Sequence, residues 1–314
     1  MNLLRCLTLP AAALAVAFTA QAKIERTIEK TFTVANPGTL RVSTQGGEIR
    51  VTPSRDGLVR IVAREKIDAT SDAAADRLLK DLTLTIEQTG DDIAATARYE
   101  RPWRGWFHFG SWPPVHVSFE ISLPDAFASD LRTSGGRITV GDLAGPANAR
   151  TSGGSITLGN MGSTVDARTS GGHITLAGAR GDVALHTSGG GITVGRIGGS
   201  ADLSTSGGSI KVDGIEGKID AHTSGGGITA TITGPLKADC TFGTSGGSVR
   251  VTVDKTAAFR LDASTSAGGV HAEGLPITLD TVDRNRSHLA GTVNGGGPLL
   301  KLHTSGGGIT VQTR

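Results

Sequence analysis

The chain has 314 residues, and 31 Lys and Arg against 29 Asp and Glu leave a formal net charge of +2. So small a charge excludes a general binder of nucleic acid or of an anionic membrane surface. Glycine is in excess at 46 residues, while only 8 Phe, 3 Trp and 1 Tyr are aromatic. This composition predicts a repetitive chain whose backbone segments pack closely.

Residues 1–22 have the features of a secretory signal peptide. Arg5 supplies the positive start, residues 7–19 are mostly apolar, and Ala20-Gln21-Ala22 is a small-x-small cleavage site before Lys23. The apolar stretch is shorter than the ~20 residues that a membrane span needs. We therefore expect export to the periplasm or cell envelope, or secretion, with no transmembrane anchor. Cleavage leaves Cys240 as the only thiol and no intramolecular disulfide.

Residues 23–125 are expected to form an irregular, β-rich region. Alternating apolar residues predict strands over residues 24–34, 39–51, 58–63, 82–86, 93–99 and 115–123. Ser71 is a suitable N-cap for one short helix over residues 72–80. Residues 44–51, Thr-Gln-Gly-Gly-Glu-Ile-Arg-Val, have the spacing of a repeat that recurs later in the chain. This region is therefore predicted to begin the repeat architecture and to cap its end.

An aromatic segment interrupts this region. Residues 99–119 hold all three tryptophans of the chain, and the prolines and glycines between them predict a loop. Two interpretations stay open: the aromatic side chains cover the end of the core, or they bind a sugar, a membrane interface or a protein partner. The candidate binding residues are Trp103, Trp106, Trp112, Arg101 and Arg104.

Residues 126–314 are dominated by the repeated tetrad Thr-Ser-Gly-Gly. It begins every 18 residues at Thr133, Thr151, Thr169, Thr187, Thr205 and Thr223, and it returns after longer steps at Thr244, Thr265 (with one inserted Ala) and Thr304. Within each repeat two pairs of apolar positions alternate with period two, which is typical of strands with one buried face. The sequence therefore predicts an all-β parallel β-solenoid with 18-residue coils.

Two details of the repeat are also interpreted. The 39-residue step before Thr304 reads as two coils, one of which has lost its tetrad. The paired glycines are expected to take positive φ at a corner and to let neighbouring coils approach.

Two outward columns of charged residues suggest a site. The acidic column, three residues before the tetrad Thr, is Asp130, Asn148, Asp166, Asp202 and Asp220. The basic column, one residue before it, is Arg132, Arg150, Arg168, His186, His222 and His303. We interpret them as columns that neutralise each other between coils. The alternative is a set of catalytic carboxylates, as in polysaccharide-cleaving enzymes, but Asn148 and Ala184 interrupt the column.

No metal or cofactor is expected. Hydrophobic residues occupy the positions at which a calcium β-roll has glycine and aspartate. His186 and His222 are two coils apart, about 9.6 Å, which is too far to share one metal ion. An exposed threonine column, interrupted by Lys211, suits an outward strand position better than an ice-binding face.

Several segments together resemble a known family. They are Phe32-Thr33-Val34 with Pro37-Gly38, Leu40 and Val42, then Gly47-x-Ile49-x-Val51, the helix-bearing insertion and the series of Ser-Gly-Gly-x-Ile units. This pattern is similar to that of the bacterial exported proteins called putative adhesins, a family of unknown function. The resemblance implies a glycine-rich β-solenoid and supplies no catalytic residues.

The sequence thus favours a non-enzymatic exported β-solenoid that offers an adhesion, binding or scaffolding surface. A carbohydrate-active enzyme, either a polysaccharide lyase or a hydrolase, is the alternative. The expected partner is a protein or glycan of the cell envelope. Because residues 309–314 read as the last strand with no cap after it, end-to-end pairing through this open edge is also expected.

Overall fold

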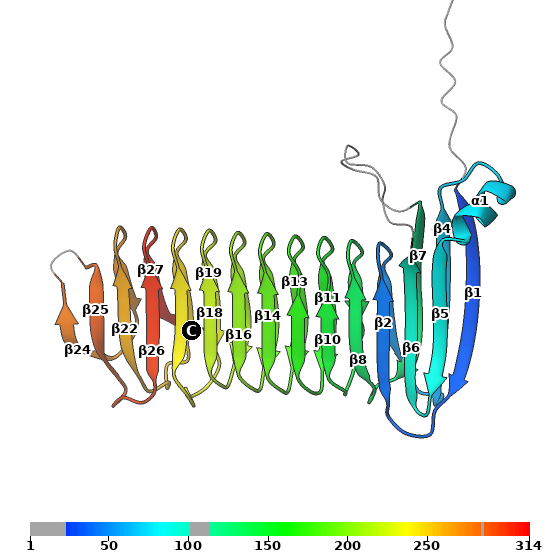
Figure 1. Ribbon diagram of the computed structural model, residues 1–314. Coiled ribbons are helices and arrows are strands. Elements are labelled where there is room, and N and C mark those ends of the chain that lie inside the picture. Colours follow the sequence, from blue (N-terminus) through cyan, green and yellow to red (C-terminus); the bar gives the residue numbers. More distant parts are fainter. Residues whose placement is uncertain (1–22, 101–113, 284–285) are drawn as a thin grey trace, which may run out of the picture.

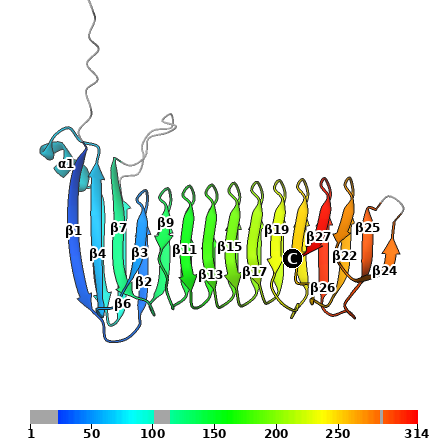
Figure 2. The ribbon, with the colours of Figure 1, turned by 180° about the vertical axis from the view of Figure 1, so that it is seen from behind.

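The computed structural model describes residues 23–100, 114–283 and 286–314. They form a long rod of stacked strands (Figure 1), seen from behind in Figure 2. A 13-stranded sheet, here sheet A, packs against a 14-stranded sheet, here sheet B. The described part of the chain contains one short helix, α1 (Asp72–Leu79). The predicted all-β solenoid is therefore confirmed.

The regular coils each give one strand to each sheet. Sheet A receives β9 (Ile138–Val140), β11 (Ile156–Met161), β13 (Ile174–Ala179), β15 (Ile192–Ile197), β17 (Ile210–Ile215), β19 (Ile228–Ile232) and β21 (Val249–Val253). Sheet B receives β8 (Ala128–Thr133), β10 (Ala147–Arg150), β12 (Val165–Arg168), β14 (Val183–Thr187), β16 (Ala201–Thr205), β18 (Ile219–Thr223) and β20 (Cys240–Thr244). Successive strands pair in parallel and in register, so Ile156, Ile174 and Ile192 stack and are fully buried.

The tetrad threonine, at the corner between the two sheets, is buried and links adjacent coils. The Thr205 hydroxyl donates to the carbonyl oxygen of Gly190 at 2.7 Å and accepts the N–H of Gly208 at 3.4 Å. The buried threonines are Thr44, Thr133, Thr151, Thr169, Thr187, Thr205, Thr223, Thr244, Thr265 and Thr304. Because a buried carbonyl without a partner is costly, this repeated bond explains why a hydroxyl recurs at an inward position.

The second glycine of the tetrad is required by close contact between coils. A Cβ built on Gly190 would overlap the carbonyl oxygen of Gly172, whereas one built on Gly189 would lie 3.2 Å from the Gly171 oxygen. The expected close approach is therefore confirmed. The expected positive φ is wrong, because the described glycines with positive φ are Gly57, Gly90, Gly234, Gly274, Gly295 and Gly296. The tetrad corner turns without the left-handed conformation.

The amino-terminal region continues both sheets. Its strands are β1 (Ile24–Thr33), β2 (Thr39–Thr44), β3 (Ile49–Ser54), β4 (Leu58–Ile67), β5 (Leu82–Thr89), β6 (Asp92–Tyr99) and β7 (Val115–Pro124). β2 and β3 form the predicted first coil, in parallel register with β8 and β9. Beyond them β6 and β7 add a further rung, and β1, β4 and β5 finish the rod as antiparallel strands. Ser71 caps α1 as predicted, accepting the Ala74 N–H at 3.3 Å.

The carboxy-terminal coil does not lie at the end of the rod. The last strands are β22 (Phe259–Thr265), β23 (Val270–Glu273), β24 (Ile277–Val282), β25 (His288–Val293), β26 (Leu299–Thr304) and β27 (Ile309–Thr313). β26 lies between β20 and β22, and β27 lies between β21 and β23 (Figure 1). The expectation of an open edge at residues 309–314 is therefore wrong, because β27 is paired on both sides.

The 39-residue step is also not two coils. β24 and β25 form an antiparallel hairpin that extends sheet B beyond β22. The edges at this end are β23 in sheet A and β24 in sheet B.

Candidate functional site

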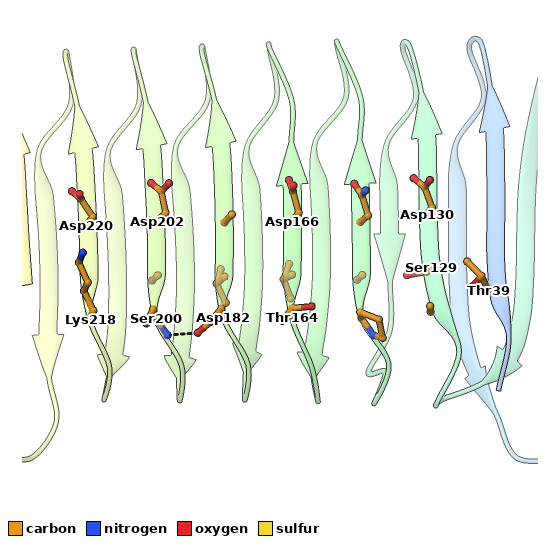
Figure 3. A pocket seen from close by; sticks show the side chains of 18 residues that line it. Thr39, Ser129, Asp130, Thr164, Asp166, Asp182, Ser200, Asp202, Lys218 and Asp220 are labelled. Carbon is orange, nitrogen blue, oxygen red and sulfur yellow. Dashed lines mark hydrogen bonds between the residues drawn. The ribbon is translucent and has the colours of Figure 1, made fainter. Parts of the chain in front are cut away.

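The outward face of sheet B carries the two predicted charged columns. Asp130, Asn148 and Asp166 are paired from coil to coil, and Ala184, Asp202 and Asp220 continue the same column. A shallow trough of about 700 Å³ follows this column from β8 to β18. Figure 3 shows the labelled carboxylates along successive strands, all on the face that the trough occupies.

At the β8 end of the trough, arginine side chains of the basic column form ion pairs with the carboxylates of the acidic column. Arg132 Nη2 lies 3.0 Å from Asp130 Oδ2. Asp166 is held twice, with Oδ1 2.9 Å from Arg168 Nε and Oδ2 3.6 Å from Arg150 Nη2 of the preceding coil. The interpretation of the columns as mutually neutralising is therefore confirmed here.

Histidines replace the arginines further along the rod. His222 Nε2 lies 2.6 Å from Asp220 Oδ1, and His186 Nε2 lies 3.9 Å from Asp202 Oδ2. These contacts are partly exposed, so each contributes little to stability. They leave the acidic column with a base beside each of its aspartates.

One carboxylate of the trough lies outside the acidic column. Asp182 is two residues before Ala184, and its Oδ1 accepts the backbone N–H of Ser200 in the next coil at 2.8 Å (Figure 3). This bond joins two coils. The carboxylates of the trough therefore lie beside a basic side chain or bond the backbone, and among its described lining residues no pair of acids stands apart from the repeat.

The model of a known protein family matches most of this chain. The model of the family described as Toastrack DUF4097 matches residues 37–312. The chain belongs to the Toastrack DUF4097 family. The match runs through the amino-terminal region as well as the repeats and confirms the resemblance inferred from the sequence. A comparison with curated proteins gave no match.

Solved structures similar to this Toastrack chain are distant in sequence. A putative adhesin from Parabacteroides distasonis is 12% identical, with 92% of this chain and 97% of that chain covered and a TM-score of 0.44. A putative adhesin from Bacteroides fragilis is also 12% identical, with the same coverages and a TM-score of 0.33. A putative lipid binding protein from P. distasonis is 14% identical, with 91% of this chain and 96% of that chain covered and a TM-score of 0.36.

The aromatic candidates cannot be placed at the trough. Trp103, Trp106, Trp112, Arg101 and Arg104 all lie outside the described residues.

Among the described residues of the Toastrack chain, the free thiol belongs to Cys240. Cys240 is buried, and burial raises the pKa of its thiol, which disfavours the nucleophilic thiolate. Within residues 23–100, 114–283 and 286–314, no three His, Cys, Asp or Glu side chains cluster as metal ligands would. The same residues include no helix with the length and apolar character to cross a membrane.

A further hollow, which the sequence did not predict, lies on sheet B beyond the trough. It has a volume of about 530 Å³ and is lined by His222, Gly243, Lys301 and His303 together with serine and threonine hydroxyls. Gly243 and Lys301 depart from the two columns and are the signals that could have indicated it. Gly243 and Lys301 come together in one hollow only because β26 lies beside β20, and the sequence did not predict this position of β26.

Proposed function

We propose that this chain is a non-enzymatic, exported β-solenoid whose sheet B face serves as an adhesion, binding or scaffolding surface in the cell envelope. The observation that carries the proposal is the repeated pairing of the trough carboxylates. Asp130, Asp166 and Asp220 each lie within 3.0 Å of the side chain of an Arg or His two residues on. A hydrolase or lyase needs acids set apart for catalysis, whereas a binding face needs only a regular array of weak contacts.

The construction of the rod supports a binding role. Each coil is joined to the next by backbone ladders in both sheets and by the buried tetrad threonine, so the face is fixed before a partner arrives. Preorganised surfaces lose less conformational entropy on binding. Equivalent groups repeated at about 4.8 Å along the rod can engage a long partner at several points. A glycan or an extended protein of the envelope fits this arrangement.

A binding and turnover experiment tests the proposal. Purified residues 23–314 are incubated with isolated cell envelopes, and retained protein and released sugar ends are measured together. We expect saturable retention without new reducing or unsaturated ends. The double variant Asp166→Asn and Asp220→Asn should weaken retention, whereas Thr175→Asn and Thr193→Asn on sheet A should not. Sugar release that these aspartate substitutions abolish would overturn the proposal in favour of an enzyme.

Export is proposed from the signal sequence and tested separately. When cells express the full-length chain, fractionation should recover the cleaved protein in the periplasmic or envelope fraction. A variant that lacks residues 2–22 should stay in the cytoplasm. Cytoplasmic recovery of both forms would contradict export.

The tryptophan segment is proposed as an auxiliary binding element on sequence grounds alone. Replacing Trp103, Trp106 and Trp112 by Ala should reduce envelope retention while leaving the melting temperature within a few degrees if the segment binds a partner. A large fall in melting temperature with unchanged retention would instead assign these residues to the core.

A further inference from the structure

The hollow on sheet B lies where both charged columns change. In the basic column, His222, Gly243 and His303 are paired in register on β18, β20 and β26. In the acidic column, Asp220 is followed by Thr241 and then by Lys301. The carboxylates of the trough thus give way to a hydroxyl and an ammonium group over these coils.

Gly243 opens the hollow between the two histidines. A Cβ at Gly243 would lie 2.5 Å from His222 Nδ1, so the imidazole of His222 leans over the glycine. Its Nε2 is engaged with Asp220 Oδ1 at 2.6 Å, which leaves Nδ1 on the side of the hollow. On the far side His303 Nδ1 bonds the Ser264 hydroxyl at 3.1 Å, so its Nε2 is the ring nitrogen left for a ligand.

Serine and threonine residues make up most of the rest of the lining, and an exposed hydroxyl can donate or accept a hydrogen bond. The lining includes the hydroxyls of Ser204, Ser206, Ser224, Thr241, Ser245 and Ser305. Lys301 supplies a positive charge, and within the described chain it forms no ion pair. No Asp or Glu among the described residues lines the hollow.

The ammonium group of Lys301, Nε2 of His303 and several hydroxyls line one hollow, and no carboxylate among the described residues lines it to repel an anion. A charge-assisted hydrogen bond from an ammonium group favours an oxyanion as the ligand. We infer that the hollow binds a sulfate, phosphate or carboxylate group carried by an anionic glycan. This inference names the ligand class for the surface proposed above and rests on that proposal.

Two carboxylates lie near the hollow without lining it. Asp220 on β18 lies 2.6 Å from His222 Nε2, and Asp262 on β22 lies 3.0 Å from His288 Nε2. Each of these acids already has a histidine beside it.

The test measures binding of three probes to residues 23–314 by calorimetry: inorganic sulfate, inorganic phosphate and a uronic acid oligosaccharide. We expect saturable binding of at least one probe, weakened about tenfold by Lys301→Gln or by His303→Gln. Gly243→Val, which fills the gap, should have the same effect. Lys211→Gln on sheet A should leave binding unchanged, and melting temperatures report the folding of every variant.

The outcomes separate this inference from the proposed function. Absence of saturable binding for all three probes, or equal binding by wild type and the hollow variants, overturns the oxyanion site. If envelope retention persists in that case, the proposed function stands without it. Preference for the uronic acid over the inorganic ions assigns the site to a carboxylated glycan, and the reverse order assigns it to a sulfated or phosphorylated one. If probes bind but wild type is not retained on envelopes, the proposed function fails while the hollow is still an oxyanion site.

Discussion

The middle of the rod and its two ends are built by different rules. From β8 to β21 the coils stack in the order of the chain, with parallel pairing throughout. At the amino end, the coil of β2 and β3 lies between β6–β7 and β8–β9, and at the other end the coil of β26 and β27 lies between β20–β21 and β22–β23. The first and last tetrads of the sequence thus belong to interior coils. The repeat determines the cross-section of the rod, but it leaves the stacking order open.

This difference also explains how the ends avoid uncontrolled pairing. The outermost strand β1 carries the charged Glu25, Arg26, Glu29 and Lys30, and β23 is only four residues long. β24 has a register irregularity between Leu279 and Thr281. Charged, short and irregular edges are the usual protection against edge-to-edge association. End-to-end pairing stays a proposal, and β23 and β24 are the strands that would carry it.

The largest effect is expected in the middle of the rod. Ile174 is fully buried and Thr175 faces solvent. Ile174→Asp should cost several kcal/mol because its carboxylate is buried without a partner. Thr175→Asp should leave the thermal midpoint almost unchanged. Equal midpoints for the two variants would contradict the inward and outward assignment.

A second pair of variants tests the contact between coils. Gly190→Ala should destabilise the chain by about 1–3 kcal/mol, because its methyl group would overlap a backbone carbonyl. Gly189→Ala is the matched control one residue earlier, where the methyl group would meet its nearest atom at 3.2 Å, and it should cost a few tenths of that. Chemical denaturation measures both. A greater loss for Gly189→Ala would refute the close approach at the second glycine.

Hydrogen exchange compares the interior coil with the end coil directly. Amides of β27 should exchange at least about tenfold more slowly than those of β23, since β27 is paired on both sides and β23 is an edge. Mass spectrometry of peptides covering residues 270–273 and 309–313 gives the comparison. Faster exchange in β27 than in β23 would indicate that β27 is an edge strand at the end of the rod, which contradicts the interior position described here.

A small pH effect is expected where the last residue meets the coil before it. The Thr256 backbone N–H, the Thr256 hydroxyl and the Arg314 guanidinium lower the pKa of Asp254 from 3.8 to about 2. Since the pKa is lower in the folded state, these contacts stabilise fully above 3.8 and are lost as the pH falls toward 2. The difference in melting temperature between wild type and Asp254→Asn should therefore shrink between pH 4 and pH 2. A difference in melting temperature that stays constant over this pH range would show that the charge of Asp254 does not contribute to stability.

Several features could be predicted from local sequence because they depend on one coil. The alternation at Ile174 and Thr175 defines which side of a strand is buried, and the spacing of Thr44 to Val51 matches a repeat wherever it stands. The place of Thr304 could not be predicted, because its tetrad stacks equally well on Thr244 and Thr265. The hollow was missed for the same reason, since Gly243 becomes a gap between two histidines only after β26 is placed beside β20.

The central claim is that the outward face of sheet B is the binding surface. Ala184 interrupts the acidic column in the middle of the trough, so a photo-crosslinking amino acid there touches whatever occupies this face. Thr193 on the outward face of sheet A is the matched position for comparison. After irradiation with intact envelopes, we predict a crosslinked product from position 184 and none from position 193. Crosslinking from position 193 alone, or equal crosslinking from both, would contradict the account.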